Sequence, residues 1–208
     1  MWFIYLRFFF IRSAIRAYQQ VLYLDTQFVR RSDIHLRLGL IYKQLADYST
    51  SLKHFQRALT DSTGGCSLTR SEISYLIGLI YEQQENYFQA QNIYEKLLQE
   101  SLPLKLEGLV LRQLGCLYFS HDNLQSDKEE QIKKAIITLE KASKCDPTCG
   151  LTYYYLGRCH AAVKNHTEAF YTYRNCVDKL DQNADIWCSI GFVYFHRKSF
   201  RISFFFSS

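Results

Sequence analysis

Residues 38–42 read LGLIY, and close variants of this pentapeptide recur at 77–81 (IGLIY), 114–118 (LGCLY), 156–160 (LGRCH) and 190–194 (IGFVY). The successive glycines, from Gly39 to Gly191, lie 39, 37, 42 and 34 residues apart. A pattern that returns at such a period indicates structural repeats that stack on their neighbours. Apolar residues recur at i, i+3 and i+4 around each glycine, which predicts that the repeats are built from helices.

The pattern resembles the tetratricopeptide repeat, in which two antiparallel helices pair about every 34 residues. When each glycine is set at position 8 of such a unit, the other consensus positions are filled too. In the first full repeat Ser51 falls at position 20, Phe55 at 24 and Ala58 at 27. Small residues at positions 8 and 20 let the two helices approach closely, and large ones at 11 and 24 fill the space beside them. The sequence therefore predicts an all-α protein, a right-handed superhelix of antiparallel helix pairs without β-sheet.

We expect one repeat array with irregular ends. An aromatic segment at 1–13, either a degenerate helix or non-native sequence, precedes an array at 14–196 and an aberrant tail at 197–208. The array divides into a half repeat at 14–31, repeats at 32–65, 71–104, 108–149 and 150–183, and a partial repeat at 184–196. The third repeat carries a polar insertion near 121–130, which a turn between helices tolerates because loop entropy grows slowly with length. A terminal repeat normally has a polar outer face, so the bare aromatic tail suggests a fragment of a longer protein.

The composition and the motifs argue against several classes of function. The formal charge of +5 over 208 residues is mild, and no continuous basic stripe suits nucleic acid. The apolar first eleven residues are too few to span a membrane. Seven scattered cysteines without a CxxC pair predict neither a disulfide framework nor a zinc ribbon, and they favour a reducing compartment. Because the common catalytic motifs are also absent, we expect no enzyme activity, cofactor or metal in this chain, and protein partners.

Several longer stretches resemble the repeat region of the UTX/UTY histone lysine demethylases. The stretches are AIRAYQQVLYLD at 14–25, SDIHLRLGLIYKQLADYSTSLKHFQRAL at 32–59, YYLGRC at 154–159 and ADIWCSIGFVY at 184–194. In that family the repeats precede a JmjC oxygenase domain, which uses Fe(II) and 2-oxoglutarate to remove the Polycomb-deposited methyl mark from histone lysine. The resemblance implies catalysis only for the parent protein, and for this chain a role as a scaffold in chromatin and transcription regulation.

The same resemblance implies a nuclear location and partners among the subunits of histone-modifying or transcription-regulatory complexes. The alternative is a corepressor or chaperone-adaptor repeat protein of another family. The two differ in what should lie downstream: a JmjC domain in the continuing reading frame belongs to the first alone.

A partner groove is expected along positions 2, 5, 9, 12 and 13 of the first helix in each repeat. These positions predict a groove lined by Leu36, Leu40, Lys43, Tyr75, Leu79, Glu82, Arg112, Phe119, Tyr154 and Arg158. Positions 5 and 9 are mostly apolar, so a clamp of basic side chains for a terminal carboxylate is not expected. The mixture suits an extended or helical peptide with apolar anchors. For Leu40 and Leu79, packing on the adjacent repeat is an equally good interpretation.

Overall fold

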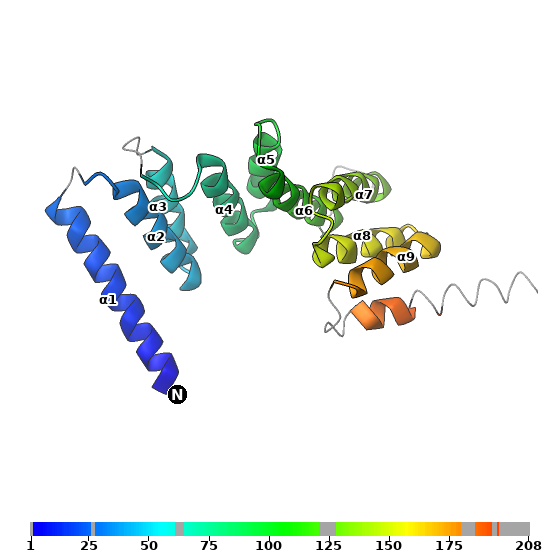
Figure 1. The fold of residues 1–208 in the computed structure, drawn as a ribbon, viewed down its shortest axis with the longest axis horizontal. Coiled ribbons are helices and arrows are strands. Elements are labelled where there is room, and N and C mark those ends of the chain that lie inside the picture. Colours follow the sequence, from blue (N-terminus) through cyan, green and yellow to red (C-terminus); the bar gives the residue numbers. More distant parts are fainter. Residues whose placement is uncertain are drawn as a thin grey trace, which may run out of the picture. The chain divides into compact units, whose positions relative to one another are not determined.

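The computed structural model describes residues 2–25, 28–60, 65–120, 128–179, 186–192 and 195, with side chains from residue 9 onward (Figure 1). Every regular element within these residues is helical, so the all-α prediction is confirmed. The helices are α1 (Trp2–Leu24), α2 (Arg31–Gln44), α3 (Tyr48–Thr60), α4 (Arg70–Gln83), α5 (Tyr87–Leu97), α6 (Leu104–Ser120), α7 (Lys128–Cys145), α8 (Gly150–Ala162) and α9 (His166–Val177). Residues 186–192 are helical as well.

The chain forms two compact units, Met1–Ile93 and Tyr94–Ser208, and the division falls inside α5. In unit 1, α1 packs on α2, α2 pairs with α3, and α3 packs on α4. The core of this unit joins buried side chains from three helices, among them Leu36, Phe55 and Ile77, and Ile93 of α5 packs against it. Helix α1 is continuous across the boundary that the sequence suggests at residue 13, because no glycine or proline interrupts residues 2–24.

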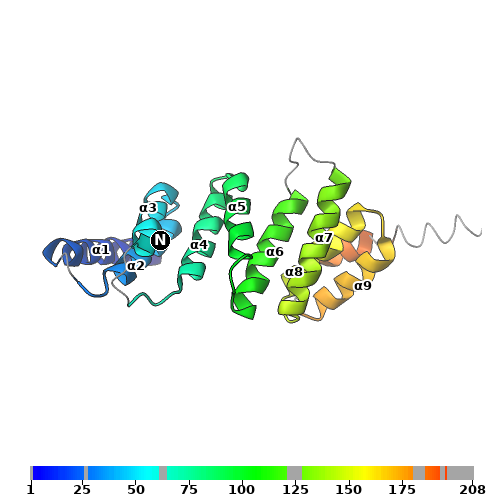
Figure 2. The ribbon, with the colours of Figure 1, turned by 90° about the horizontal axis from the view of Figure 1, so that it is seen from above.

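In unit 2, α6 pairs with α7, α7 packs on α8, and α8 pairs with α9. Figure 2 shows α6 and α7 side by side. Helix α7 begins at Lys128, so the last three residues of the expected insertion at 121–130 are helical, while 121–127 lie outside the described residues. The predicted tail at 197–208 also lies outside them. The phenol of Tyr118 on α6 donates a hydrogen bond to Glu95 Oε1 at 2.9 Å, which ties the end of α5 to this unit.

The two helices of a pair meet where the repeated glycine lies. A Cβ atom added to Gly39 would lie 2.7 Å from Cε1 of Phe55, far inside the normal contact distance between carbon atoms. Ser51 at position 20 is fully buried and donates a 2.7 Å hydrogen bond to the carbonyl of Gly39. The predicted steric logic of positions 8, 20 and 24 is therefore confirmed in the first repeat. Two further glycines have the same relation to their partner helix, Gly115 to Leu139 at 2.6 Å and Gly157 to Tyr173 at 2.7 Å.

The turns that follow α2, α4 and α8 share one geometry. After α2, Ala46 has a φ of 59°, and the next N–H, of Asp47, donates to the carbonyl of Tyr42 at 3.0 Å. This bond across six residues closes the helix in the manner of a Schellman motif. Asp47 also begins the next helix, since its carboxylate accepts a hydrogen bond from the N–H of Thr50 at 3.1 Å. The turns after α4 and α8 repeat the geometry with Glu85 and Asn86, and with Lys164 and Asn165.

Candidate functional site

The six candidate groove residues of unit 1 differ in how available they are. Leu36 is only 2% exposed and belongs to the core shared by α2, α3 and α4, so its prediction as a groove residue is wrong. The periodicity of α2 placed it on a surface that the next repeat covers. Leu40 is half-buried and packs against the same core, which favours the packing interpretation for it. Tyr75 and Leu79 on α4 are likewise half-buried.

Lys43 on α2 and Glu82 on α4 come close enough to interact electrostatically. Burial lowers the pKa of the Lys43 ammonium, while the Glu82 carboxylate acts in the opposite direction. Both side chains are half-buried. Position 12 of two successive repeats thus presents a cation beside an anion. Because each charge offsets the other, the pair attracts a charged partner only weakly.

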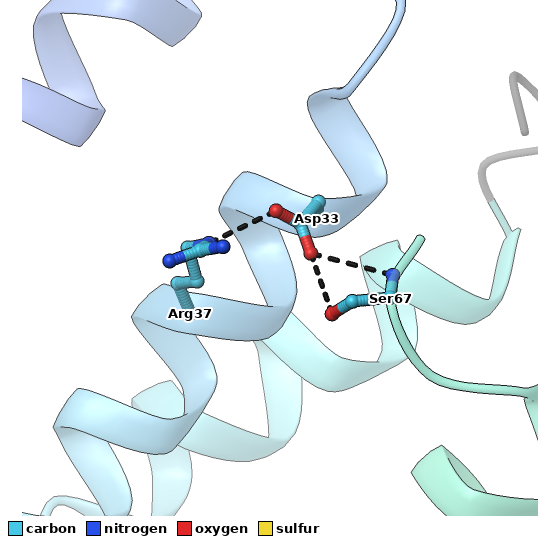
Figure 3. A network of polar contacts seen from close by, with 3 residues as sticks. All are labelled: Asp33, Arg37 and Ser67. Atoms are coloured by element: carbon cyan, nitrogen blue, oxygen red, sulfur yellow. Dashed lines mark hydrogen bonds and ion pairs between the residues drawn. The ribbon is translucent and has the colours of Figure 1, made fainter. Parts of the chain in front are cut away.

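Asp33, at position 2 of the first repeat, has a structural role instead of facing a partner. Its carboxylate accepts a 2.9 Å hydrogen bond from Nε of Arg37 and a 2.8 Å bond from the hydroxyl of Ser67 (Figure 3). Burial acts to raise the pKa of Asp33, but these hydrogen bonds outweigh it and hold the pKa below its ordinary value. Ser67 lies just before α4, so Asp33 anchors the connection between α3 and α4.

Three of the four candidates in unit 2 form one cluster. The guanidinium of Arg158 on α8 lies 5.1 Å from the ring centroid of Phe119 on α6 and 5.8 Å from that of Tyr154. Each cation–π contact at an exposed site contributes on the order of 0.5–1 kcal/mol. The two rings therefore hold an exposed, charged side chain in place, which lowers the entropy cost when it binds a ligand.

A pocket of about 490 Å³ lies beside this cluster. Its lining comes from α8, from Tyr173 on α9 and from the helical segment at 186–192, and consists of Arg158, Ala161, Ala162, Tyr173, Cys188, Ser189 and Phe192. We call it the Arg158 pocket. Arg158 is the one charged residue in that set, and burial raises the pKa of Tyr173 to about 12, so its phenol is neutral at physiological pH. The pocket therefore combines an apolar surface with a single fixed cation.

Of the residues that line the Arg158 pocket, only Arg158 was predicted as a groove residue. Cys188 and Phe192 occupy positions 5 and 9 of the fifth repeat when Gly191 is set at position 8. The position rule that selected Tyr154 and Arg158 would have found both, had it been applied to the partial repeat. Tyr173 carried no such signal, because position 24 is expected to be buried, and its side chain is indeed 2% exposed.

Arg112, the fourth candidate of unit 2, contacts a cysteine. Its Nη1 donates a 3.1 Å hydrogen bond to Sγ of Cys149, which precedes α8. Burial acts to raise the pKa of Cys149, but hydrogen bonds from Thr152 and Arg112 outweigh it and lower the pKa. In contrast, burial raises the pKa of Cys159 to about 12. Cys159 and Cys176 are fully buried and fill space in the core as small apolar residues do.

In the described part of the chain, no group of three or more His, Cys, Asp and Glu residues is arranged to hold a metal ion. A search of the same residues for helices that combine the length and the apolarity needed to cross a bilayer finds none. The Arg158 pocket is a cavity whose lining includes one of the predicted groove residues, Arg158.

Helix pairs that cross at a glycine, as α2–α3, α6–α7 and α8–α9 do, define an α-helical repeat scaffold, a class of protein that serves mainly to bind other proteins. The model of one family, the tetratricopeptide repeat, matches residues 32–60 and 71–101. The fold is accordingly a tetratricopeptide-repeat solenoid.

Curated relatives match only parts of the chain. The anaphase-promoting complex subunit CDC16 of Saccharomyces cerevisiae is 30% identical over 95 residues, which is 44% of this chain and 11% of CDC16. The mouse tetratricopeptide repeat protein 12 is 32% identical over 50 residues, or 24% of this chain and 6% of that protein. This chain therefore spans a small fraction of the length of the curated relatives it matches.

Solved structures share the fold over most of the chain. A tetratricopeptide repeat protein from Parabacteroides merdae has a TM-score of 0.69 at 14% identity, with 93% of this chain and 69% of that chain covered. YrrB, described as a tetratricopeptide-repeat protein with an unusual peptide-binding site, has a TM-score of 0.61 at 18% identity, with 88% and 84% covered. At these identities the likeness establishes the fold alone.

Proposed function

We propose that this chain is a protein-interaction module that binds a peptide segment of a partner in the Arg158 pocket. The observation that carries the proposal is the guanidinium of Arg158, fixed by the rings of Phe119 and Tyr154 at the edge of an apolar cavity. A ligand that fits such a site places an acidic side chain on Arg158 and an apolar side chain against Phe192. The apolar contact supplies affinity through buried area, and the charge pair supplies orientation.

The relatives support an adaptor role. CDC16 is by name a subunit of a multiprotein complex, and YrrB is described by its peptide-binding site. These comparisons favour the alternative stated above, an adaptor repeat protein of another family, over a UTX-type origin. The UTX-type interpretation, with its nuclear location and its histone-modifying partners, rests on the sequence stretches quoted above. Sequencing of the full transcript tests it, since a downstream JmjC domain would be required.

The peptide proposal is tested with two labelled peptides that differ only in charge, one alternating leucine with glutamate and one alternating leucine with glutamine. Fluorescence anisotropy should show tighter binding of the glutamate peptide. Arg158→Gln should weaken binding of that peptide by at least about tenfold, because a charge-assisted hydrogen bond contributes about 1.5–3 kcal/mol, and should leave binding of the glutamine peptide unaffected. Phe192→Ser should weaken both peptides.

The matched control is Arg174→Gln, which removes the same charge from an exposed position on α9 outside the pocket lining. It should change neither affinity. Equal binding of both peptides by the unmodified chain, or equal losses in Arg158→Gln and Arg174→Gln, would mean that the pocket does not read charge and that the proposal is wrong.

A further inference from the structure

Gly191 is exposed, unlike the glycines at the three helix crossings described above. Gly39, Gly115 and Gly157 are buried, and each lies against a large side chain of the second helix in its pair. Within the described residues, no atom lies within 4 Å of a Cβ added to Gly191. The helical segment at 186–192 therefore presents the first half of such a crossing, with its glycine accessible to a second helix.

Helix α1 presents the other half of a crossing. In the half repeat expected at 14–31, Ala14, Tyr18 and Val21 occupy positions 20, 24 and 27, which belong to a second helix. In the three pairs that cross at a glycine, the residues at these positions are at most 5% exposed, and they are Ser51, Phe55, Ala58, Ala135, Leu139, Ala142, Ala169, Tyr173 and Cys176. In α1 the same positions are more open, since Ala14 and Tyr18 are half-buried and Val21 is 36% exposed.

The contacts of Tyr18 place α1 as the second helix of a repeat. The phenol of Tyr173 on α9 is hydrogen-bonded to Ser189, which is at position 6 of the next repeat. The phenol of Tyr18 accepts a hydrogen bond from Arg37, which is at position 6 of the repeat that follows α1. Helix α1 therefore meets α2 as α9 meets the segment at 186–192, and its partly exposed face is the one that a first helix would cover.

We propose that copies of this chain associate head to tail, with α1 of one copy paired with the segment at 186–192 of another. In this contact Tyr18 lies over Gly191 as Tyr173 lies over Gly157, where an added Cβ would be 2.7 Å from the ring. The occupant is a second copy because the pairing is one that the chain already makes within itself. The apolar faces of both helices gain from leaving water together.

The contact is heterologous, because the two faces differ. Each copy keeps one free face after pairing, so the association can continue to longer assemblies. Ala14 allows the same close approach as the fully buried Ala169 does in α9. Gly191 does not line the Arg158 pocket, and the inference does not rest on the proposed function.

The test is sedimentation velocity of the full chain over a range of concentrations, in which the mean mass should rise with concentration. Ala14→Arg blocks one face, because a long charged side chain does not fit a crossing where position 20 is fully buried. Gly191→Arg blocks the other, and the open space around Gly191 lets the variant keep its fold. Each change should weaken self-association at least about tenfold.

Mixing the two variants is the decisive measurement. Each variant keeps one intact face, so the mixture should form a dimer of one copy of each and no longer assembly. A chain that had only lost its fold would not regain association in this way. A mixture that stays monomeric would overturn the proposal. An unmodified chain that stays monomeric at every concentration would overturn it too, and would assign these faces to another occupant.

Gln20→Arg is the matched control, because it adds the same side chain to the same helix at position 26. That position is exposed in all three pairs, where it holds Arg57, Lys141 and Asn175. The control should leave self-association unchanged. A loss as large as that in Ala14→Arg would show that added charge alone disperses the chain, and would contradict the proposed pairing. These results do not bear on the peptide proposal, since none of the three changed residues lines the Arg158 pocket.

Discussion

Replacing Gly39 with alanine should destabilise the first helix pair. A Cβ atom at this position would lie 2.7, 2.8 and 3.0 Å from three carbon atoms of the Phe55 ring. Ordinary contacts between carbon atoms are about 3.5–4.0 Å, so either the ring or a helix must move. The ring is fully buried, and the fully buried Ser51 ties α3 to the Gly39 carbonyl, so neither moves easily.

The magnitude follows from two opposing effects. Alanine favours a helix over glycine by about 1 kcal/mol. Overpacking a filled core costs about 1–3 kcal/mol, and three close contacts with one immobile ring place this site near the upper end. The net expectation is a loss of about 2 kcal/mol, which corresponds to roughly a thirtyfold change in the local opening equilibrium.

Hydrogen exchange followed by mass spectrometry measures this locally. Amides of α2 and α3 should exchange about thirtyfold faster in Gly39→Ala, because a loss of about 2 kcal/mol shifts their opening by that factor, while those of α8 and α9 serve as an internal reference. Gly191→Ala is the matched control, since an added Cβ there has nothing within 4 Å. It should leave exchange in α2 and α3 unchanged. Slower or unaltered exchange in α2 and α3 of Gly39→Ala would refute the claim that the helix crossing depends on the missing side chain.

Ala46→Gly should stabilise the chain by about 0.5–1 kcal/mol in thermal unfolding, because glycine adopts a φ of 59° without alanine's steric cost; an unchanged midpoint would contradict this. Asp33→Asn should cost about 1–2 kcal/mol at neutral pH by weakening two hydrogen bonds. Because the pKa of Asp33 is lowered in the folded state, the difference in unfolding free energy between the unmodified chain and the variant is fully present above the unfolded pKa of 3.8. It vanishes as the pH falls through the folded pKa, and urea titrations at several pH values check this. Iodoacetamide should alkylate Cys149 before Cys159, and Arg112→Gln should slow the reaction at Cys149, as peptide mapping can follow.

The sequence was sufficient for the fold because the helix crossings depend on side-chain size. A glycine opposite a large residue is a local pattern that repeats, and Gly39 with Phe55 or Gly157 with Tyr173 lie where that pattern predicts. The beginning of the chain was harder to predict. The first ten residues of α1, Trp2–Ile11, are apolar apart from Arg7, so periodicity alone did not indicate that Trp2–Leu24 forms one helix.

The candidate sites were only partly predictable. Position in the repeat predicted Phe119, Tyr154 and Arg158 as groove residues, and the structure places them in contact. It also selected Leu36, since position alone does not say whether the next helix covers a side chain.

The shared turn geometry has a consequence for how the chain folds. Each of the turns after α2, α4 and α8 is completed by hydrogen bonds between residues at most five apart. Contacts that are close in sequence carry little loop-closure cost and form rapidly. The α2–α3 and α8–α9 hairpins are therefore the natural first products of folding, and stacking of one hairpin on the next is the slower step. During synthesis, each hairpin can therefore form as soon as both of its helices have left the ribosome.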